Sequence, residues 1–201
     1  MYPIITISRE FGSGGHSIGE AVAKQLGLPF YDGEIVKEVA LQSGYAHELI
    51  EEQGEYGSSA NMWFDITAAS AMNFKSPQDE IFIIQKKVIL DIAKKGPCVI
   101  VGRCADYILK KAGIPAMNIM IHADMEHRTE RVLARYEKIS DVSIEKRLAK
   151  KDKARKAYYK YYTDGNWGDY RNYDLALDSG NLGEELCVKM ICELAAVFPK
   201  K

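Results

Sequence analysis

The sequence is poor in cysteine and has no long apolar run. Its four cysteines, Cys98, Cys104, Cys187 and Cys192, form no CxxC pair. Cysteines this few and this irregularly spaced argue against a disulfide framework or a zinc site and favour reduced thiols. No apolar run approaches the ~18 residues that a membrane span needs. We therefore expect a cytoplasmic protein that does not associate with a membrane.

The sequence also lacks an excess of charge of either sign. Its 27 Lys and Arg side chains nearly balance 28 Asp and Glu, which leaves a formal net charge of −1. Such a chain has no global field that would draw it to nucleic acid. The charge is nevertheless uneven: residues 32–80 carry ten acidic and two basic side chains, and residues 125–160 carry twelve basic and six acidic. We expect these two regions to face each other across the glycine-rich segment at residues 12–19.

Two common catalytic patterns are missing as well. The histidines His47, His122 and His127 have no HxH, HxxxH or HExxH spacing, which argues against a transition-metal site. No GxSxG is present, which argues against a hydrolase with the usual nucleophilic serine motif.

What is present is a regular alternation of short apolar runs with helical periodicity. Parallel strands are predicted over residues 3–7, 29–31, 98–101, 117–121 and 173–177. Helices are predicted over residues 16–26, 34–42, 81–95, 125–136, 143–162 and 184–197. This order predicts an α/β three-layer sandwich with a five-stranded parallel sheet.

The chain reads as one domain with two interruptions. The core would comprise about residues 1–43, 81–139 and 171–201, because no repeat or linker divides them. An acidic insert at residues 44–80 and a basic region at residues 140–170 break the alternation. Both follow elements expected to end at the carboxyl edge of the sheet, where open α/β folds bind ligands.

The segment FGSGGHS joins the first strand to the first helix. Gly12, Gly14 and Gly15 permit positive φ and close approach, and the following helix start adds partial positive charge, so phosphate is the expected anion. Ser17 can approach a metal or a phosphate oxygen. A tight turn without a ligand is the alternative. The pattern GxxxxGK[ST] is absent because no lysine precedes Lys24, and GxGxxG is incomplete, so a nucleoside triphosphate fits better than NAD.

The chain resembles the cytidylate kinase-like family of P-loop nucleoside monophosphate kinases over nearly its full length. The segments ITISREFGSGG, LGLPFYD, VIVGRCADYIL, DKARKAYYKYYT and NYDLALDS stand in the family's order. The resemblance implies a P-loop fold with a substrate-side insert and a lid, and transfer of the ATP γ-phosphate, with Mg²⁺, to a nucleoside monophosphate or a related small phosphate acceptor. A nucleotide-binding regulator of the same fold without phosphotransfer is the alternative.

The family's functional residues carry over position by position. The resemblance implies catalytic roles for Arg103, Arg131 and Arg155, and we also predict a catalytic role for Arg9, at the start of the loop. It implies nucleotide binding by Gly12, Ser13, Gly14, Gly15, His16, Ser17 and Arg128, with Ser17 also assisting Mg²⁺. It implies substrate binding by Asp32, Arg103, Lys151 and Asp152, with Asp152 orienting the lid arginine, Arg155.

The sequence departs from the family's pattern at the loop and beside Arg103. Gly15 stands where the phosphate-binding lysine belongs, and Arg9 stands where the first glycine of the loop belongs. His16 stands where relatives often have arginine. Val101 and Cys104 replace the aspartates that usually flank the Gly-Arg pair, which puts the usual magnesium arrangement in doubt.

Simpler readings of these residues stay open. Asp32 is also a candidate for the N-cap of the next helix. Arg103 could instead cap a helix or pair with Asp106. Arg131 could belong to a solvated row of charged side chains on its helix. The Lys, Arg and Tyr residues of 146–162 suit RNA stacking, but helix packing is favoured. The acidic side chains of the insert have three readings: solvent exposure, a homodimer surface, or recognition of a base amine.

Overall fold

The computed structural model describes residues 2–32, 35, 77–135 and 143–199. Its strands are β1 (Ile4–Arg9), β2 (Phe30–Tyr31), β3 (Val99–Val101), β4 (Ala116–His122) and β5 (Leu175–Asp178). Its helices are α1 (Gly15–Leu26), α5 (Pro77–Lys95), α6 (Ala105–Lys111), α7 (Met125–Arg135), α8 (Ile144–Thr163) and α9 (Ser179–Val197), with a short 3-10 helix at Tyr170–Asn172.

The five strands form one parallel sheet in the order β2-β3-β1-β4-β5, which confirms the predicted fold class. β1 is central: Ile5 pairs with Val99 of β3 on one side and with Met117 of β4 on the other. The chain therefore leaves β1 toward one edge and later returns to its other side. Such a switch in strand order opens a ligand crevice at the carboxyl ends of the strands.

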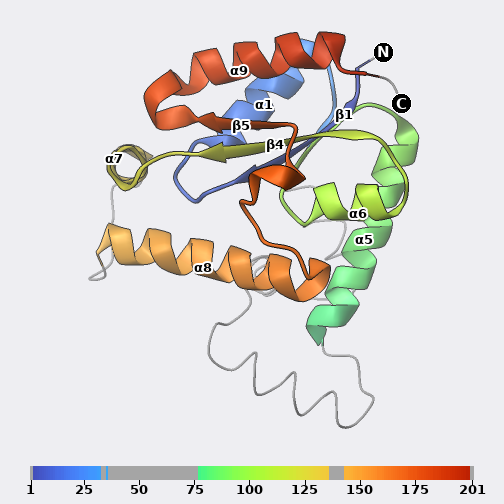
Figure 1. The fold of residues 1–201 in the computed structure, drawn as a ribbon, viewed down its shortest axis with the longest axis horizontal. Helices are drawn as coiled ribbons and strands as arrows, with labels where there is room; N and C mark the ends of the chain where they lie inside the picture. Colours follow the sequence, from blue (N-terminus) through green and yellow to red (C-terminus); the bar gives the residue numbers. More distant parts are fainter. Residues whose placement is uncertain (1, 33–34, 36–76, 136–142, 200–201) are drawn as a thin grey trace.

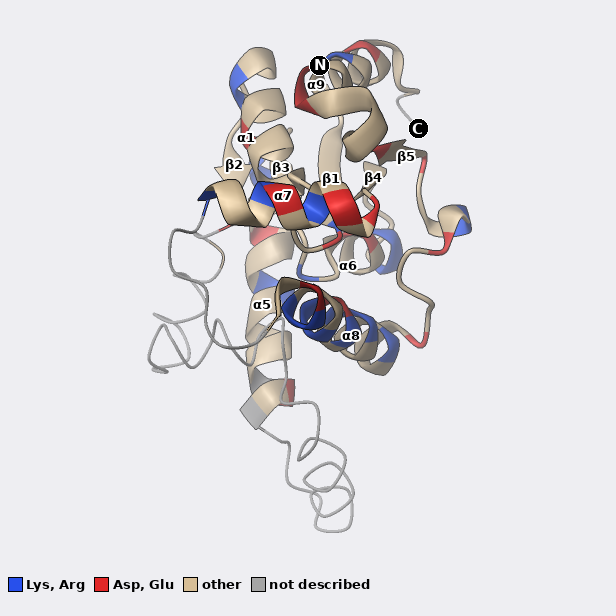
Figure 2. Ribbon diagram, turned by 90° about the vertical axis from the view of Figure 1, so that its left-hand side faces the viewer, with Lys and Arg blue, Asp and Glu red and all other residues tan. Residues whose placement is uncertain are grey.

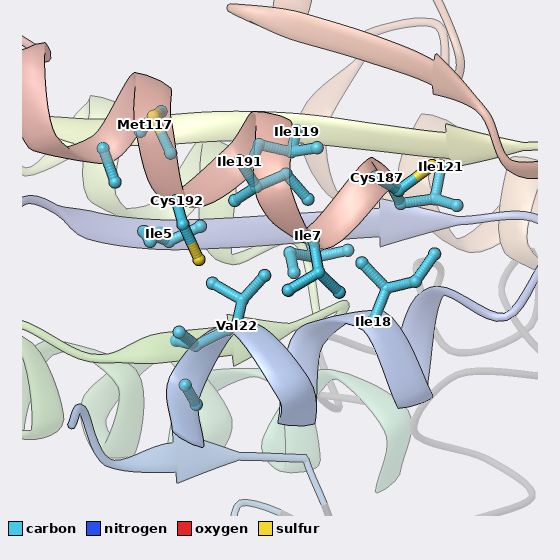
Figure 3. Packing of buried hydrophobic residues seen from close by; sticks show 14 of the residues in the cluster. Ile5, Ile7, Ile18, Val22, Met117, Ile119, Ile121, Cys187, Ile191 and Cys192 are labelled. Carbon is cyan, nitrogen blue, oxygen red and sulfur yellow. The ribbon is translucent and has the colours of Figure 1, made fainter. Parts of the chain in front are cut away.

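Two separate cores cover the two faces of the sheet (Figure 1). On one face, α1 and α9 pack their apolar side chains against β1 and β4; Ile18, Val22 and Ile191 meet Ile7 and Ile119 there (Figure 3). On the other face α5 and α6 bury a second cluster that includes Ile89, Ile100 and Leu109. These β-branched strands are buried on both faces, which is why they read as continuous apolar runs.

The remaining two helices lie at the carboxyl edge of the sheet. α7 crosses in front of the strand ends, and α8, which carries many of the lysines and arginines, runs beneath it (Figure 2). Ser143 caps α8, because its hydroxyl accepts a hydrogen bond from the backbone N–H of Lys146. Among the described helices, none is long and apolar enough to cross a membrane.

The structure differs from the sequence prediction at three helices. α6 was not predicted, although Ala105, Ile108 and Leu109 share the i, i+3, i+4 spacing of a buried helical face. α5 begins at Pro77, inside the predicted insert. α9 begins at Ser179 and is broken by a non-helical Gly183, so the predicted start at residue 184 matches its second part. The rest of the insert and most of the helix predicted over 34–42 lie outside the described residues.

Candidate functional site

The glycine-rich loop folds as a turn between β1 and α1. Gly12 and Gly14 have φ of +83° and +79°, values that side chains rarely adopt, and Gly14 is the residue before the first helical one. The buried hydroxyl of Ser13 donates to the carbonyl of Glu10 at 2.9 Å, which ties the turn to itself. The start of α1 thus points its unpaired N–H groups into the loop, as an anion site requires.

A buried charge network holds the loop from below. Arg128 of α7 donates from Nε to the carbonyl of Phe11 at 2.8 Å and lies 3.3 Å from the Glu10 carboxylate. It also forms an ion pair with Asp152 of α8. Asp152 in turn accepts a hydrogen bond from the backbone N–H of Phe11 at 2.8 Å. These contacts fix the loop to α7 and α8 through Arg128 and Asp152, whose side chains are almost fully buried.

On the outer side of the loop, two further arginines of α7 approach it. Arg131 lies 3.0 Å from the carboxylate of Glu184 and donates to the carbonyl of Gly12 at 3.2 Å. Arg135 donates to the Ser17 hydroxyl at 3.4 Å. The predicted stripe on α7 is therefore turned toward the loop and is not a purely solvated face.

Asp32, directly after β2, lies between the side chains of Arg9 and His16. Its carboxylate is 3.8 Å from Nη2 of Arg9 and 3.3 Å from Nε2 of His16. His16 also meets the ring of Phe30 edge-on, with the ring centroids 5.3 Å apart. Asp32 thus orients the side chains at both ends of the loop.

Arg103 lies in a strained turn directly after β3. Arg103 and Cys104 both have positive φ, 60° and 54°, which non-glycine residues rarely adopt. The Arg103 side chain is buried, and in the described part of the chain its Nε and Nη1 atoms have no hydrogen-bond partner. An unpaired buried guanidinium is costly, so this position is one where strain and burial point to a ligand.

The wall opposite Arg103 comes from α8. Arg155 donates from Nη1 to the carbonyl of Arg9 at 2.8 Å and lies 3.8 Å from Asp152, as expected if Asp152 orients it. The hydroxyl oxygen of Tyr158 accepts a hydrogen bond from Nε2 of Gln85, on α5, at 3.0 Å, and burial raises the pKa of this phenol. The neighbouring Tyr159 donates to Asp106 at 2.8 Å.

Asp106 is therefore not the partner of Arg103 that one reading of the sequence suggested. Its carboxylate is bound by the Tyr159 hydroxyl, and burial is the largest cause of its raised pKa. No ion pair joins Arg103 to Asp106 among the described residues. Nε and Nη1 of Arg103 thus remain without a hydrogen-bond partner among the described residues.

Two pockets meet at this edge. The first, the loop pocket, has a volume of about 320 Å³ and is lined by the glycines of the loop with His16, Asp32, Arg131 and Arg135. The second, the Arg103 pocket, is a cavity of about 20 Å³ walled by Arg103, Cys104, Tyr158, Tyr159 and Trp167. Among the described residues, Arg9 and Arg155 line both pockets.

The residues at the loop fit a metal ion only in part. In the described ranges, no group of three His, Cys, Asp or Glu side chains is arranged to hold one. Ser17 offers a hydroxyl on the first turn of α1 that accepts from Arg135 and retains a second lone pair. These donors fit a Mg²⁺ ion that is held mainly by phosphate oxygens and water and carried in with a nucleotide.

The predicted site residues thus separate into two groups. The pocket walls contain Arg9, Gly12, Gly14, Gly15, His16, Asp32, Arg103, Arg131 and Arg155. Outside the walls lie Ser13, Ser17, Arg128, Lys151 and Asp152, and Lys151 stands 5.9 Å from the centre of the Phe11 ring. The ligand roles of both groups stay predictions. The sequence did not indicate Glu10, Gln85 and Glu184 as residues that contact the site, because their partners are distant in sequence.

Comparisons with known proteins identify the family and agree with the fold. The Cytidylate kinase-like family matches residues 4–181. A cytidylate kinase of Archaeoglobus fulgidus is 27% identical over 200 residues, which cover 98% of this chain and 96% of the relative. A crystal structure of an uncharacterized protein from Eubacterium ventriosum, 28% identical, superposes with a TM-score of 0.68 over 96% of this chain and 98% of that one.

Shikimate kinase from Bacteroides thetaiotaomicron, at 14% identity, shares the fold with a TM-score of 0.58 over 96% of this chain and 98% of its own. The parallel sheet, the loop after β1 and the helices across its carboxyl edge define the class: this is a protein of the P-loop kinase fold. Within that class, the chain belongs to the Cytidylate kinase-like family, which places it among the kinase-type phosphotransferases.

Proposed function

We propose that the protein transfers the γ-phosphate of ATP to a nucleoside monophosphate or a related small phosphate acceptor. The observation that carries this proposal is the Arg103 pocket. Three buried arginines, Arg9, Arg103 and Arg155, line it, and no described Asp or Glu side chain does. Guanidinium groups bind phosphate in a bidentate fashion, so a dianionic phosphate matches this cluster in charge and in geometry.

The loop pocket supplies the donor side. The helix start at Gly15 and the backbone of residues 12–15 would bind the β- and γ-phosphates, with Arg131 beside them. Ser17 would contribute one oxygen to Mg²⁺, which supplies charge neutralisation at the phosphates when bound. Arg103 would hold the acceptor phosphate, and Arg155 would close over the transferred group.

The Arg103 pocket must widen before an acceptor enters. A cavity of about 20 Å³ has room for about one water molecule. Its outer wall is α8. Asp152 of α8 is hydrogen-bonded to the loop at Phe11. Tyr159 and Tyr158 of α8 are hydrogen-bonded to α6 and α5, respectively. α8 would therefore act as a lid that opens for the acceptor and then excludes water from the transfer.

A regulator that binds nucleotide without transferring phosphate is the second candidate. It is favoured by Gly15 at the lysine position and by Val101 and Cys104 beside Arg103. The two functions separate in one experiment. If ATP raises the melting temperature, no acceptor is phosphorylated and Arg155→Ala leaves the thermal shift unchanged, the regulator is supported.

The direct test is an assay of purified protein with ATP, Mg²⁺ and a panel of acceptors. The panel contains CMP, dCMP, UMP, AMP and GMP, with shikimate as a non-nucleotide control. We expect turnover with at least one pyrimidine monophosphate, and turnover of no acceptor would refute the kinase proposal. A cytoplasmic location, the absence of nucleic-acid binding and the homodimer alternative stay predictions, checked by cell fractionation, RNA-binding assay and light scattering.

A further inference from the structure

Two departures from the usual P-loop pattern lie in contact with each other. When the loop is aligned without gaps on that of ordinary cytidylate kinases, Arg9 stands at the position of the first glycine and Gly15 at that of the lysine. A Cβ atom added at Gly15 would lie 2.4 Å from Cβ of Arg9 and 2.9 Å from its Cγ. The stem of Arg9 therefore occupies the space that any side chain at position 15 needs. An arginine at position 9 and a lysine at position 15 exclude each other.

The side chain of Arg9 reaches the boundary between the two pockets. It is 10% exposed, its Nη2 atom lies 3.8 Å from the Asp32 carboxylate, and the residue lines both the loop pocket and the Arg103 pocket. A phosphoryl group that moves from the loop to an acceptor at Arg103 must cross this boundary. Positive charge is most effective at the place where negative charge moves during the reaction.

The backbone of Arg9 is held firmly. Arg9 is the last residue of β1 and pairs with Ile121 of β4, and its carbonyl accepts from Arg155 at 2.8 Å. A guanidinium on a rigid strand, with Asp32 beside it, is positioned before substrate binds, which favours precise contact with the transferred group.

We propose that Arg9 performs the task of the missing lysine by contacting the γ-phosphate in transit. Gly15 is then required because it leaves room for the arginine stem. This inference rests on the proposed function. In the transfer, the bond between the γ-phosphorus and the β–γ bridging oxygen breaks, and a bond forms between that phosphorus and an acceptor oxygen. Arg9 stays protonated and donates hydrogen bonds throughout.

A simpler role for Arg9 is to pair with Asp32 and shape the loop. The two roles predict different results when a lysine is introduced at position 15 in a variant that lacks Arg9. If the side chain only shapes the loop, no charge introduced at position 15 restores transfer. If it supplies charge to the phosphate, a lysine at position 15 together with glycine at position 9 rebuilds the ordinary loop and restores transfer.

The experiment compares the wild type with R9A, R9K, R9G, G15K and the double variant R9G/G15K. We expect R9A to lower kcat by about 10³-fold, the range reported for arginines that neutralise a transferred phosphoryl group. R9K should retain part of kcat, G15K should be inactive, and R9G/G15K should exceed R9G at least tenfold. The control K94A removes an exposed charge far from the loop and should keep wild-type kcat.

Binding separates the failure of this inference from the failure of the proposed function. Affinities for ATP and ADP, measured by calorimetry with Mg²⁺, should show that R9A weakens ATP about tenfold and leaves ADP unchanged. If the wild type phosphorylates no acceptor but R9A lowers this ATP preference, the role of Arg9 stands and the proposed function fails. If the wild type is active and R9A changes neither kcat nor the ATP preference by more than threefold, Arg9 is not the replacement. If R9A does not fold, R9K decides by the same two measurements.

Discussion

The loop pocket and the Arg103 pocket use arginine in opposite ways. At the loop, carboxylates lie beside the guanidinium groups: Glu10 and Asp152 beside Arg128, and Glu184 beside Arg131. In the Arg103 pocket, no described carboxylate lines the wall, and two nitrogen atoms of Arg103 have no partner among the described residues. The first set of charges ties the loop to the surrounding helices, whereas under the proposed function Arg103 would bind an anion that arrives with the substrate.

The largest difference between the two pockets is expected when Arg103 is removed. Arg103→Gly should lower kcat/KM for the acceptor by about 10³-fold, because the acceptor phosphate loses its bidentate partner. The free energy of unfolding, from urea titration, should stay within about 1 kcal/mol of the wild type or rise, since glycine relieves the positive φ and no folded-state bond is lost. Arg171→Ala, an exposed control, should keep activity; a large loss of stability in Arg103→Gly would contradict the account.

The opposite result is expected on the loop side. Asp152→Ala leaves Arg128 buried with one carboxylate fewer and removes the acceptor of the Phe11 N–H. Breaking a buried ion pair on one side costs about 3–5 kcal/mol, so urea unfolding should show a loss of that order. The control Asp91→Ala removes an exposed partner of Lys94 and should cause no measurable change. Equal stability of Asp152→Ala and the wild type would mean that the network does not hold the loop.

Alanine substitution at two glycines with positive φ separates an effect on ATP binding from an effect on stability alone. Gly14 and Gly27 have φ of +79° and +64°, but a Cβ at Gly14 would lie 2.6 Å from Oε1 of Glu184, whereas a Cβ at Gly27 would have no atom of the described residues within 4 Å beyond its chain neighbours. Alanine at either position should cost about 1 kcal/mol through backbone strain. Only Gly14→Ala should also weaken ATP binding, by about tenfold, because it displaces the Glu184–Arg131 pair at the loop. Thermal melting and calorimetry measure the two effects, and equal ATP affinities would refute the difference.

The smallest effect is expected at Asp106, which is hydrogen-bonded to Tyr159 in the wall of the Arg103 pocket. Burial raises the pKa of Asp106, so this group stabilises the fold when protonated and loses that contribution as pH rises from its unfolded value of 3.8 through its higher folded value. Asp106→Asn keeps an acceptor for Tyr159 and removes this loss. At pH 7 the variant should melt roughly 2–4 °C higher, the shift expected for about 1 kcal/mol in a chain of this size. At pH 3 the advantage should vanish; a constant difference across pH would contradict the assignment.

The sequence predicted the sheet well because its strands are buried on both faces and read as uninterrupted apolar runs. It also placed the glycine-rich loop between the first strand and the first helix, and Arg103 after a strand, as the structure has them. It did not predict α6, whose seven residues are too few to show a clear helical period. Nor did it predict that Arg128 and Asp152 support the loop, since these partners are 24 residues apart and meet through packing of α7 on α8. The contact between Arg9 and Gly15 likewise depends on the loop's path in space.

The measurement that tests the central claim most directly is binding of CMP and of cytidine in the presence of Mg²⁺ and a non-hydrolysable ATP analogue. If the Arg103 pocket is kept for an acceptor phosphate, calorimetry should show CMP bound at least 10²-fold more tightly than cytidine, about 2.7 kcal/mol. Arg103→Gly should abolish that preference without unfolding the protein. Equal affinity for the nucleotide and the nucleoside in the wild type, or an unchanged preference in Arg103→Gly, would contradict the account.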